Sequence, residues 1–288
     1  MHQVTLGLRV DVDTVLGLSR GVPRLLSLLC ELGLRCTFFV PMGPDRMGRN
    51  AKRIASEKGL SIPLLRYFSI YPWQILLNGT LRTPPGFADA GEEMMLRMRS
   101  EGHELGLHSY DHYAWQNGIS DYSRAEIERD FRKCIMRYAA VFGSLPVSSA
   151  APGWRSTELS LLTQDSFGFE YASDTRGSGP YYPSIGGRRL ATLQIPVSLP
   201  TLDEMFFLGG KSVDVPDSGT HVYCAHAEVD GLAGLGLFRD FLERALCAGA
   251  VFVPLSTLAR RFSASGEASV RAGRVPGRAS PVTVRVDI

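Results

Sequence analysis

The segment Leu6-Gly7-Leu8-Arg9-Val10-Asp11-Val12-Asp13, near the start of the chain, has the pattern of a buried β-strand that ends in two acidic residues. Side chains alternate along a strand, so Arg9, Asp11 and Asp13 share one face while the apolar residues between them pack on the other. The Cα atoms of Asp11 and Asp13 should be about 7 Å apart, which lets both carboxylates reach one metal ion or water molecule. Two solvated aspartates at the start of a loop would be the alternative explanation.

Strand and helix patterns alternate after this segment. Residues 23–32 have the apolar spacing of a helix, and the β-branched and aromatic run 35–40 predicts a second buried strand. Ser123 and Glu126 form a capping box before a long helix that we expect to end near Gly143. The other predicted strands are 104–109, 147–150, 169–173, 192–199, 221–228 and 250–254, and the other predicted helices include 89–100 and 156–167. Repeated βα units predict a parallel sheet with helices outside it, and six or more of them favour a barrel.

Two regions interrupt this alternation. Residues 42–88 form an insertion rich in Arg, Pro, Gly and aromatic residues. Residues 263–288 form a Ser/Gly/Arg/Pro-rich tail that we expect to be flexible, because such a composition does not require an ordered structure. The sequence therefore predicts one catalytic domain over residues 1–262, followed by this tail.

The composition excludes several classes of protein. The 288 residues are 44% hydrophobic, and 31 basic residues nearly balance 29 acidic ones, so the formal charge of +2 predicts no binding to nucleic acid. Five cysteines without paired CxxC spacing argue against a zinc ribbon or a disulfide framework and indicate a reducing compartment. No apolar stretch has the roughly 18 residues of a membrane span, and we expect a cytoplasmic protein.

Histidines form the second group of chemically informative residues. His108 and His112 are spaced i and i+4, which places both on one side of a helical turn, where they can bind one cation. With Asp13 they would leave coordination positions open for water and substrate, as metal-assisted hydrolysis requires. His226, at the end of another predicted strand, is placed to act as a general acid. Surface histidines that cap a helix, or a buried histidine with satisfied hydrogen bonds, would give the same pattern.

The chain contains a strand ending in Asp-x-Asp, then His-Ser-x-x-His, then a late strand ending in His. These motifs, in this order, resemble the polysaccharide deacetylase (NodB-homology) superfamily. The resemblance runs from about Leu6 to Leu258. Further segments look like one branch, the 4-deoxy-4-formamido-L-arabinose-phosphoundecaprenol deformylases. They include Gly43-Pro-Asp-Arg-Met-Gly-Arg49, Gln74-Ile-Leu-Leu-Asn-Gly-Thr80 and Gly153-Trp-Arg155. The matches inside the insertion distinguish this branch from deacetylases of chitin or peptidoglycan.

The resemblance implies a single-domain α/β fold, a distorted (β/α) barrel of seven parallel strands, with one divalent metal ion held by Asp13, His108 and His112. Zn, Mn, Co, Ni and Fe all suit such a ligand set. The implied reaction is hydrolysis of the N-formyl group of undecaprenyl-phosphate-linked 4-formamido-4-deoxy-L-arabinose, which serves lipid A modification and resistance to cationic peptides.

The same resemblance implies the catalytic roles. Asp11 would be the base that activates water, and His226 would protonate the leaving amine of the sugar. Asp174 matches the acid that orients this histidine in the family, and an adjacent carboxylate raises the pKa of a histidine.

One position departs from the family pattern. Many members carry an arginine in the third motif that pairs with the catalytic Asp, where this chain has alanine in Ser149-Ala-Ala-Pro-Gly-Trp-Arg155. We expect Arg155 or Arg9 to supply the positive charge near Asp11; otherwise Arg155 is a solvated residue at the start of a helix. The candidates for sugar or phosphate contacts are Trp154, Arg176 and Trp115.

A lipid-linked substrate would bring the protein to the inner face of the cytoplasmic membrane as a peripheral protein. Residues 60–77 combine aliphatic and aromatic side chains with one charge, Arg66, and such a stretch can lie in a bilayer interface. The basic residues upstream that could contact lipid phosphates are Arg46, Arg49, Lys52 and Arg53. A core helix beside a solvated face is the alternative. We expect neither a protein partner nor nucleic acid.

Two other functions stay open. A deacetylase of another N-acyl amino sugar, such as N-acetylglucosamine, would have the same metal site, but the insertion and the missing secretion signal argue against it. A non-catalytic protein that only binds a lipid-linked sugar would not need a general acid at His226. A structural zinc module or a nucleic-acid module would need cysteine spacing or a basic field that the chain lacks.

Overall fold

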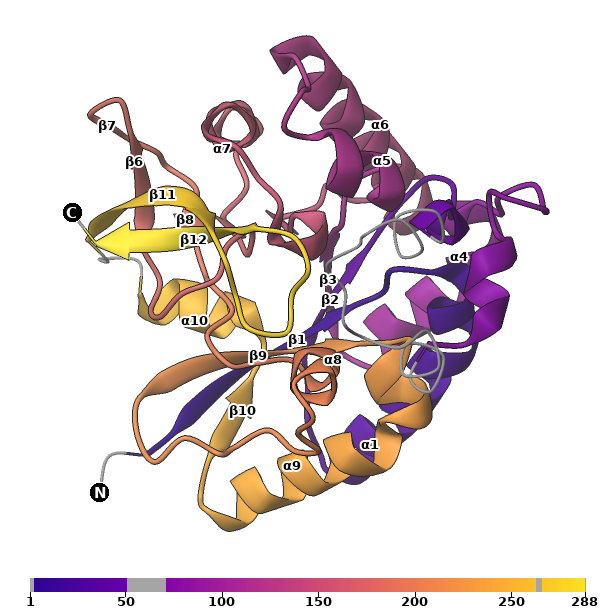
Figure 1. The fold of residues 1–288 in the computed structure, drawn as a ribbon, viewed down its shortest axis with the longest axis vertical. Helices are drawn as coiled ribbons and strands as arrows, with labels where there is room; N and C mark the ends of the chain where they lie inside the picture. The colour runs from indigo at the N-terminus through magenta and orange to yellow at the C-terminus, as the bar shows by residue number, and fades with distance from the viewer. Residues whose placement is uncertain (1–2, 51–70, 263–265, 288) are drawn as a thin grey trace.

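The computed structural model describes residues 3–50, 71–262 and 266–287. A parallel sheet forms the centre of the described part of the molecule and carries helices on its outside (Figure 1). Its strands are β1 (Thr5–Asp11), β2 (Thr37–Val40), β3 (Glu104–Leu107), β4 (Ser148–Ser149), β5 (Tyr171–Ala172), β8 (Leu193–Gln194), β9 (Thr220–His226) and β10 (Val251–Val253). The helices are α1 (Val22–Glu31), α4 (Phe87–Ser100), α5 (His112–Gly118), α6 (Arg124–Phe142), α7 (Glu158–Asp165), α8 (Leu202–Phe207), α9 (Leu235–Cys247) and α10 (Leu255–Arg261), with short helical turns η1 (Gly17–Gly21), η2 (Met47–Arg49), η3 (Trp73–Leu77), η4 (Pro152–Trp154) and η5 (Val229–Ala233).

The central strand of this sheet is β1. β9 pairs in parallel with its whole length and places His226 directly opposite Asp11. On the other edge, β10 pairs with the amino-terminal half of β1 and β2 pairs with the carboxyl-terminal half. Leu8 and Val10 belong to the core that β1 shares with the surrounding helices, whereas Arg9 contacts residues of the barrel interior. The predicted alternation along this strand is therefore present, although both faces are buried.

The strands form an incomplete barrel. Within the described residues, seven parallel strands follow one another in the order β9, β1, β2, β3, β4, β5 and β8. Among these residues, β8 and β9 do not pair as strands; the backbone N–H groups of Ser198 and Leu199, in the segment after β8, donate to the carbonyl of Val222 in β9, and the N–H of Val222 donates to the hydroxyl of Ser198. The predicted distorted barrel of seven parallel strands in one α/β domain is confirmed.

The predicted boundaries of the long helix are also correct. The side chain of Ser123 accepts a hydrogen bond from the backbone N–H of Glu126, whose own side chain accepts from the N–H of Ser123, so the capping box is complete at the start of α6. Gly143 ends the helix with a φ of 65°, a left-handed conformation that favours glycine.

A second, smaller sheet corrects the expectation of a flexible tail. β6 (Tyr182–Ile185), β7 (Arg188–Arg189), β11 (Glu267–Gly273) and β12 (Val282–Asp287) are arranged in the order β12-β11-β6-β7. β11 and β12 form an antiparallel hairpin, and β11 also pairs with β6. The backbone N–H of Arg176 donates to Thr283, and the N–H of Arg285 donates to Arg176. Residues 266–287 are thus held by backbone hydrogen bonds that composition does not reveal.

The insertion 42–88 is described only in part. Residues 51–70 lie outside the described residues, and with them Lys52, Arg53 and most of the stretch 60–77. Arg46 forms a 2.6 Å ion pair with Asp111, and the Nε of Arg49 donates to a backbone carbonyl. Both arginines, which were expected to contact lipid phosphates, therefore bind other residues of the protein. Among the described residues, no helix combines the length and apolar character that crossing a bilayer requires.

Candidate active site and metal centre

The predicted catalytic and metal-binding residues meet at the carboxyl ends of three strands. Asp11 ends β1 and is followed two residues later by Asp13. His108 follows β3, His112 begins α5, and His226 ends β9. The carboxyl ends of parallel strands lie at the same edge of a sheet, which explains why residues more than 200 positions apart can form one site.

Three of these residues form a group suited to a metal ion. The Oδ1 atom of Asp13 lies 3.4 Å from Nε2 of His108 and 3.1 Å from Nε2 of His112. All three atoms are buried and have no hydrogen-bond partner among the described residues. Buried polar atoms without partners cost free energy, and two imidazole nitrogens with one carboxylate are a common ligand set for divalent metals. The donor atoms therefore fit a divalent cation.

Neighbouring groups orient these ligands. Nδ1 of His108 lies 2.8 Å from the carbonyl oxygen of Ala150; because a carbonyl can only accept, this nitrogen carries the proton and Nε2 keeps its lone pair for a metal. Asp111 caps α5 by accepting from the N–H of Ala114, which sets the direction of the helix that carries His112. Both histidines are thus held by their local structure.

Asp11 is held by an arginine on its own strand. The Nε and Nη2 atoms of Arg9 donate to the two oxygens of the Asp11 carboxylate over 2.6 and 2.7 Å. Burial alone would raise the pKa of Asp11, but the neighbouring charges, chiefly Arg9 with a contribution from His108, together outweigh burial and hold the pKa below its usual range. Arg155 does not take this position, since its Nη2 lies 3.3 Å from the hydroxyl of Ser120. Of the two arginines considered, Arg9 is the one that contacts Asp11.

His226 is paired with a carboxylate that the sequence analysis did not identify. Its Nδ1 lies 3.1 Å from Oδ1 of Asp203, in the short helix α8. Burial alone would lower the pKa of His226, but the neighbouring carboxylates, chiefly Asp203 with a contribution from Asp13, together outweigh burial and raise the pKa to about 10. The expected partner, Asp174, instead accepts hydrogen bonds from Gln164 and Gln194, both over 2.8 Å. The expected role of Asp174 is therefore corrected to Asp203.

A local sequence signal for α8 was present. Thr201 and Glu204 form a capping box around this helix, and the pattern Thr-x-x-Glu is visible in the sequence. That signal predicts a helix start, but it does not reveal that the side chain of Asp203 reaches the end of β9.

The three residues expected to contact sugar or phosphate have different positions. The Trp154 ring lies edge-on to the ring of His226, with 6.0 Å between centroids, so it borders the site. Trp115 is buried and its Nε1 donates to the carbonyl of Arg155. Arg176 is buried in a 2.6 Å ion pair with Glu204. Trp115 and Arg176 are thus engaged inside the protein.

The C-terminal hairpin adds a residue that sequence reasoning missed. Arg278, in the loop between β11 and β12, donates from Nε to Glu204 over 2.6 Å, and its Nη2 lies 3.8 Å from Asp203. Its guanidinium also lies 4.3 Å from the centroid of the Trp154 ring. Gly277 adopts a φ of 81°, and a Cβ there would lie 2.6 Å from the carbonyl oxygen of Glu204. This close approach brings the loop against α8, the helix that carries Asp203.

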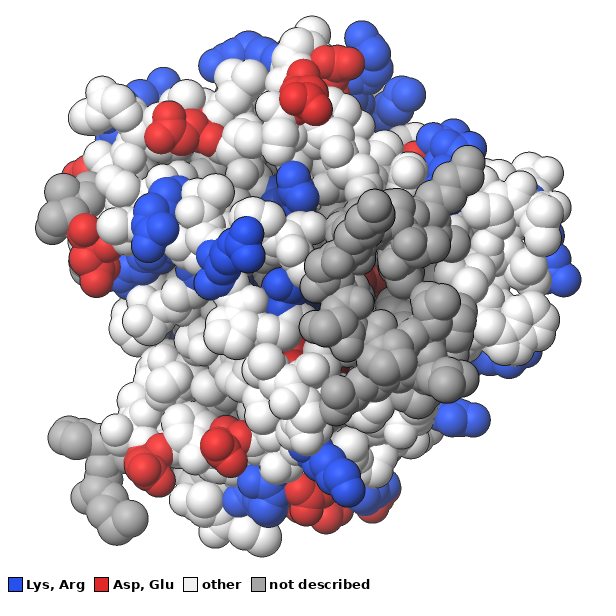
Figure 2. Space-filling view, in the orientation of Figure 1, with Lys and Arg blue, Asp and Glu red and all other residues white. Residues whose placement is uncertain are grey.

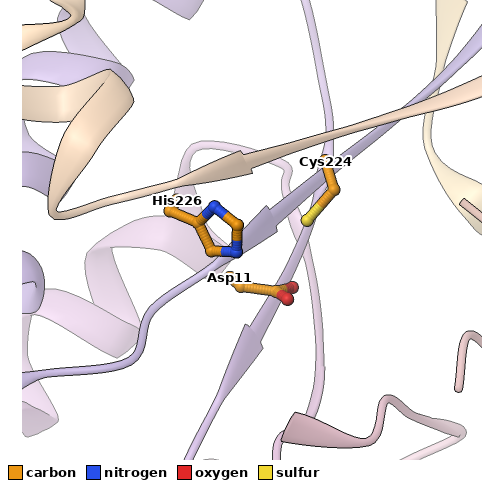
Figure 3. A group of neighbouring side chains, drawn as sticks. All are labelled: Asp11, Cys224 and His226. Atoms are coloured by element: carbon orange, nitrogen blue, oxygen red, sulfur yellow. The ribbon is translucent and has the colours of Figure 1, made fainter. Parts of the chain in front are cut away.

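A second group of possible ligands lies beside the first. The side chains of Asp11, Cys224 and His226 point toward one another (Figure 3), and one ligand atom from each lies within 4.8 Å of the others. Both oxygens of Asp11 already accept hydrogen bonds from Arg9, and burial raises the pKa of the Cys224 thiol well above its usual value. The first group, with its unpartnered atoms, fits a cation better.

Comparisons with known proteins agree with this geometry. Residues 5–172 match the family model described as "Polysaccharide deacetylase". A protein of Shewanella sediminis is 34% identical over 88% of this chain and 85% of its own length, and one of Wigglesworthia glossinidia brevipalpis is 32% identical over 84% and 88%. Both are named "Probable 4-deoxy-4-formamido-L-arabinose-phosphoundecaprenol deformylase ArnD". A crystal structure of a "putative polysaccharide deacetylase" from Mycobacterium smegmatis shares the fold, with a TM-score of 0.61, 18% identity, and coverage of 95% of this chain and 96% of that one.

Proposed function

The chain belongs to the polysaccharide deacetylase family, whose members hydrolyse amide bonds, and we propose that it removes the N-formyl group from 4-deoxy-4-formamido-L-arabinose linked to undecaprenyl phosphate. The names of the two curated relatives supply the substrate. The observation that carries the proposal is the position of Asp11 and His226, directly opposite in the β1–β9 ladder and beside three unpartnered ligand atoms. A carboxylate base and a protonated histidine on either side of one amide are what its hydrolysis requires.

Asp13, His108 and His112 would hold one divalent metal ion. When bound, such an ion polarises the amide carbonyl and lowers the pKa of water. Zn, Mn, Co, Ni and Fe all accept this ligand set, so metal analysis of the purified protein is needed to identify the ion.

Asp11 would accept the proton of the attacking water. Arg9 keeps the Asp11 carboxylate ionised and fixes its plane, while each carboxylate oxygen retains a further lone pair that can accept the proton. The water oxygen forms the new bond to the formyl carbon. Arg9 is thus a positioning residue that acts through Asp11.

His226 would protonate the sugar nitrogen as the carbon–nitrogen bond breaks. The products are formate and the free amino sugar, so one water molecule is consumed for each amide bond. Asp203 keeps the imidazole charged and holds it through Nδ1, which leaves Nε2 to donate the proton. A protein that only bound the sugar would not need this pair.

A direct assay tests the proposal. The metal-reconstituted protein is given the lipid-linked formamido sugar and an N-acetylglucosamine oligomer in parallel, and formate and acetate are measured. Formate from the first substrate that disappears in Asp11→Asn, but persists in the matched surface variant Asp240→Asn, supports the deformylase. Acetate from the oligomer alone would instead make the chain a deacetylase with the same mechanism.

We also propose a peripheral contact with the membrane that holds the substrate. Two large apolar side chains in the described part of the insertion are strongly exposed: Trp73 at 60% and Leu81 at 85%. Apolar and aromatic side chains of this kind insert into a bilayer interface. Liposome co-sedimentation should weaken in Trp73→Ser/Leu81→Ser and persist in Leu208→Ser, an exposed leucine outside the insertion. Equal sedimentation of both variants would contradict the contact.

A further inference from the structure

A buried carboxylate of the insertion holds the segment that carries Asp13. Oδ2 of Asp45 accepts a hydrogen bond from the backbone N–H of Val15 over 3.0 Å, two residues after Asp13. The side-chain amide of Asn78 donates to the same oxygen over 2.7 Å, and the N–H of Met47 donates to Oδ1 over 3.1 Å. Asp45 is only 1% exposed, so these donors satisfy its oxygens inside the protein. The backbone that follows Asp13 is therefore fixed by the insertion.

The preceding backbone N–H group is held from another part of the chain. Oε1 of Glu228, two residues after β9, accepts from the backbone N–H and from the hydroxyl of Thr14, over 2.7 and 2.8 Å. The consecutive N–H groups of Thr14 and Val15 are thus bound by two different carboxylates. Neither contact uses the side chain of Asp13, whose Oδ1 has no hydrogen-bond partner among the described residues. The segment is fixed while its ligand atom stays available.

The residue after Asp45 supports a second ligand segment. Nη1 of Arg46 donates to Oδ2 of Asp111 over 2.6 Å, while Oδ1 of Asp111 accepts from the N–H of Ala114 at the start of α5. Because both of its oxygens are bound, this capping carboxylate keeps one orientation. His112 is the first residue of the helix that it caps. Two adjacent residues of the insertion therefore reach the neighbours of two different proposed ligands.

The backbone of the insertion also approaches this second segment closely. A Cβ at Gly43 would lie 2.4 Å from the carbonyl oxygen of Tyr110, two residues before His112. The N–H of Met42 donates to the carbonyl of Ser109 over 3.3 Å. A side chain at position 43 would push the two segments apart, so the contact depends on glycine.

A solvated charged face does not account for these contacts. The right-hand part of the face drawn in Figure 2, where the insertion runs into α4, is mostly uncharged. Exposed ion pairs contribute little to stability, but the acceptors here are buried, since the side chain of Asp111 is 8% exposed and Asp45 is 1% exposed. The remaining alternative is that Asp45 and Arg46 only anchor the insertion.

We propose that Asp45 and Arg46 are positioning residues of the metal centre, which keep Asp13 and His112 close enough to share one cation. The inference rests on the metal centre of the proposed function and gives the insertion a role in it. Groups that orient the ligands of a metal contribute about tenfold to a hundredfold to metal affinity. The two ligand segments are held by the protein itself, so the ion does not have to assemble the site.

Cobalt binding to the metal-free protein tests this role without any substrate. Titration with Co²⁺, followed by the visible absorption of the bound ion, gives a Kd and a signature of its coordination. Asp45→Ala leaves the N–H of Val15 without its acceptor, and Kd should rise about tenfold, the lower end for such groups, because the contact acts through the backbone. The isosteric Asp45→Asn keeps one acceptor oxygen, so Kd should rise less, and it replaces Asp45→Ala if that variant does not fold. A wild-type Kd in both variants would overturn the role of Asp45.

Two arginines of the insertion, three positions apart, provide a matched pair. Arg46 donates to Asp111, whereas Nε of Arg49 donates to the carbonyl of Gly79 within the insertion itself. Arg46→Met should weaken Co²⁺ binding by a smaller factor than Asp45→Ala, since 38% of the Arg46 side chain is exposed. Arg49→Met should bind Co²⁺ as the wild type does. Equal Kd values in the two arginine variants would overturn the role of Arg46.

Two further measurements separate positioning from anchoring and from the proposed function. Urea unfolding of the metal-free variants measures their stability, and a loss of stability with an unchanged Kd would mean that Asp45 and Arg46 only anchor the insertion. Formate release is measured independently. If no formate forms while Kd changes as expected, the deformylase activity is overturned and the positioning role stands. A wild-type protein that binds no Co²⁺ would overturn the positioning role.

Discussion

Arg9 and Asp11 are two residues apart on β1 and form two parallel hydrogen bonds, of 2.6 and 2.7 Å, between guanidinium and carboxylate. The arrangement is possible because residues i and i+2 of a strand share one face. The guanidinium also lies 5.0 Å from the centroid of the Phe39 ring and 5.4 Å from that of Trp154, so it is fixed between two aromatic side chains. The strand that carries the proposed base therefore also carries its counter-charge.

Removing this counter-charge should impair both folding and activity. Arg9→Met leaves a buried, unpaired carboxylate, and breaking a buried ion pair from one side costs about 3–5 kcal/mol. We expect a loss of that order in the free energy of unfolding, measured with urea, and a rise in the pKa of Asp11 that moves the acid limb of the kcat/KM profile to higher pH. Arg124→Met, at an exposed position on α6, leaves the pair intact and should preserve both the stability and the acid limb. An unshifted acid limb in Arg9→Met would contradict the role of Arg9.

The pair His226–Asp203 should control the alkaline limb of the pH profile. Asp203 raises the pKa of His226 from 6.5 to about 10, so Asp203→Asn should lower this pKa and move the alkaline limb to lower pH. The same pKa shift makes the stability of the protein depend on pH. Because the pKa of His226 is higher in the folded state, its protonation stabilises the fold fully below about pH 6.5, and this contribution is lost as the pH rises toward 10.

Asp174→Asn provides the control for this prediction. Asp174 is buried as completely as Asp203 but accepts hydrogen bonds from Gln164 and Gln194 instead. Its substitution should leave the alkaline limb where it is in the wild type. A shift in Asp174→Asn that equalled the shift in Asp203→Asn would show that the partner of His226 has been misassigned.

Metal binding should be visible as thermal stabilisation. A ligand present at 100 times its Kd stabilises the folded state by about 2.7 kcal/mol, so a chelator should lower Tm and added divalent metal should restore it. In His112→Gln we expect no response of Tm to the metal, because one of three ligands is missing. His221→Gln, at a histidine outside the site whose Nε2 lies 2.9 Å from the carbonyl oxygen of Ser218, should respond as the wild type does. A full response in His112→Gln would exclude this residue as a ligand.

The contact between the hairpin and α8 should depend on Gly277. A Cβ at this position would clash with the carbonyl oxygen of Glu204 and would also require a left-handed φ of 81°. Gly277→Ala should therefore destabilise the protein by about 1–3 kcal/mol and reduce turnover, since Arg278 is displaced from Asp203 and Glu204. Gly249 has a nearly equal φ of 83° but open space around it, so Gly249→Ala measures the backbone strain alone. Equal destabilisation in the two variants would mean that the close approach is unimportant.

The sequence predicted what depends on short spacings. Asp11 and Asp13 at i and i+2, and His108 and His112 at i and i+4, lie where strand and helix periodicity place them. The capping box of α6 was equally readable, because its hydrogen bonds join residues three positions apart. The alternation of βα units also predicted the parallel sheet, since that topology follows from the order of the elements.

Only the tertiary structure determined which distant groups complete the site. Asp203 rather than Asp174 reaches His226, and Arg278 approaches both Asp203 and Trp154 from the hairpin at the end of the chain. Neither pairing has a local spacing, because each depends on how a loop packs against a strand from another part of the chain. The sequence by itself therefore determines which face of a strand or helix a side chain occupies. Long-range packing decides the partner of a buried charge, and the low dielectric of the interior makes each such pairing electrostatically stronger than it would be in water.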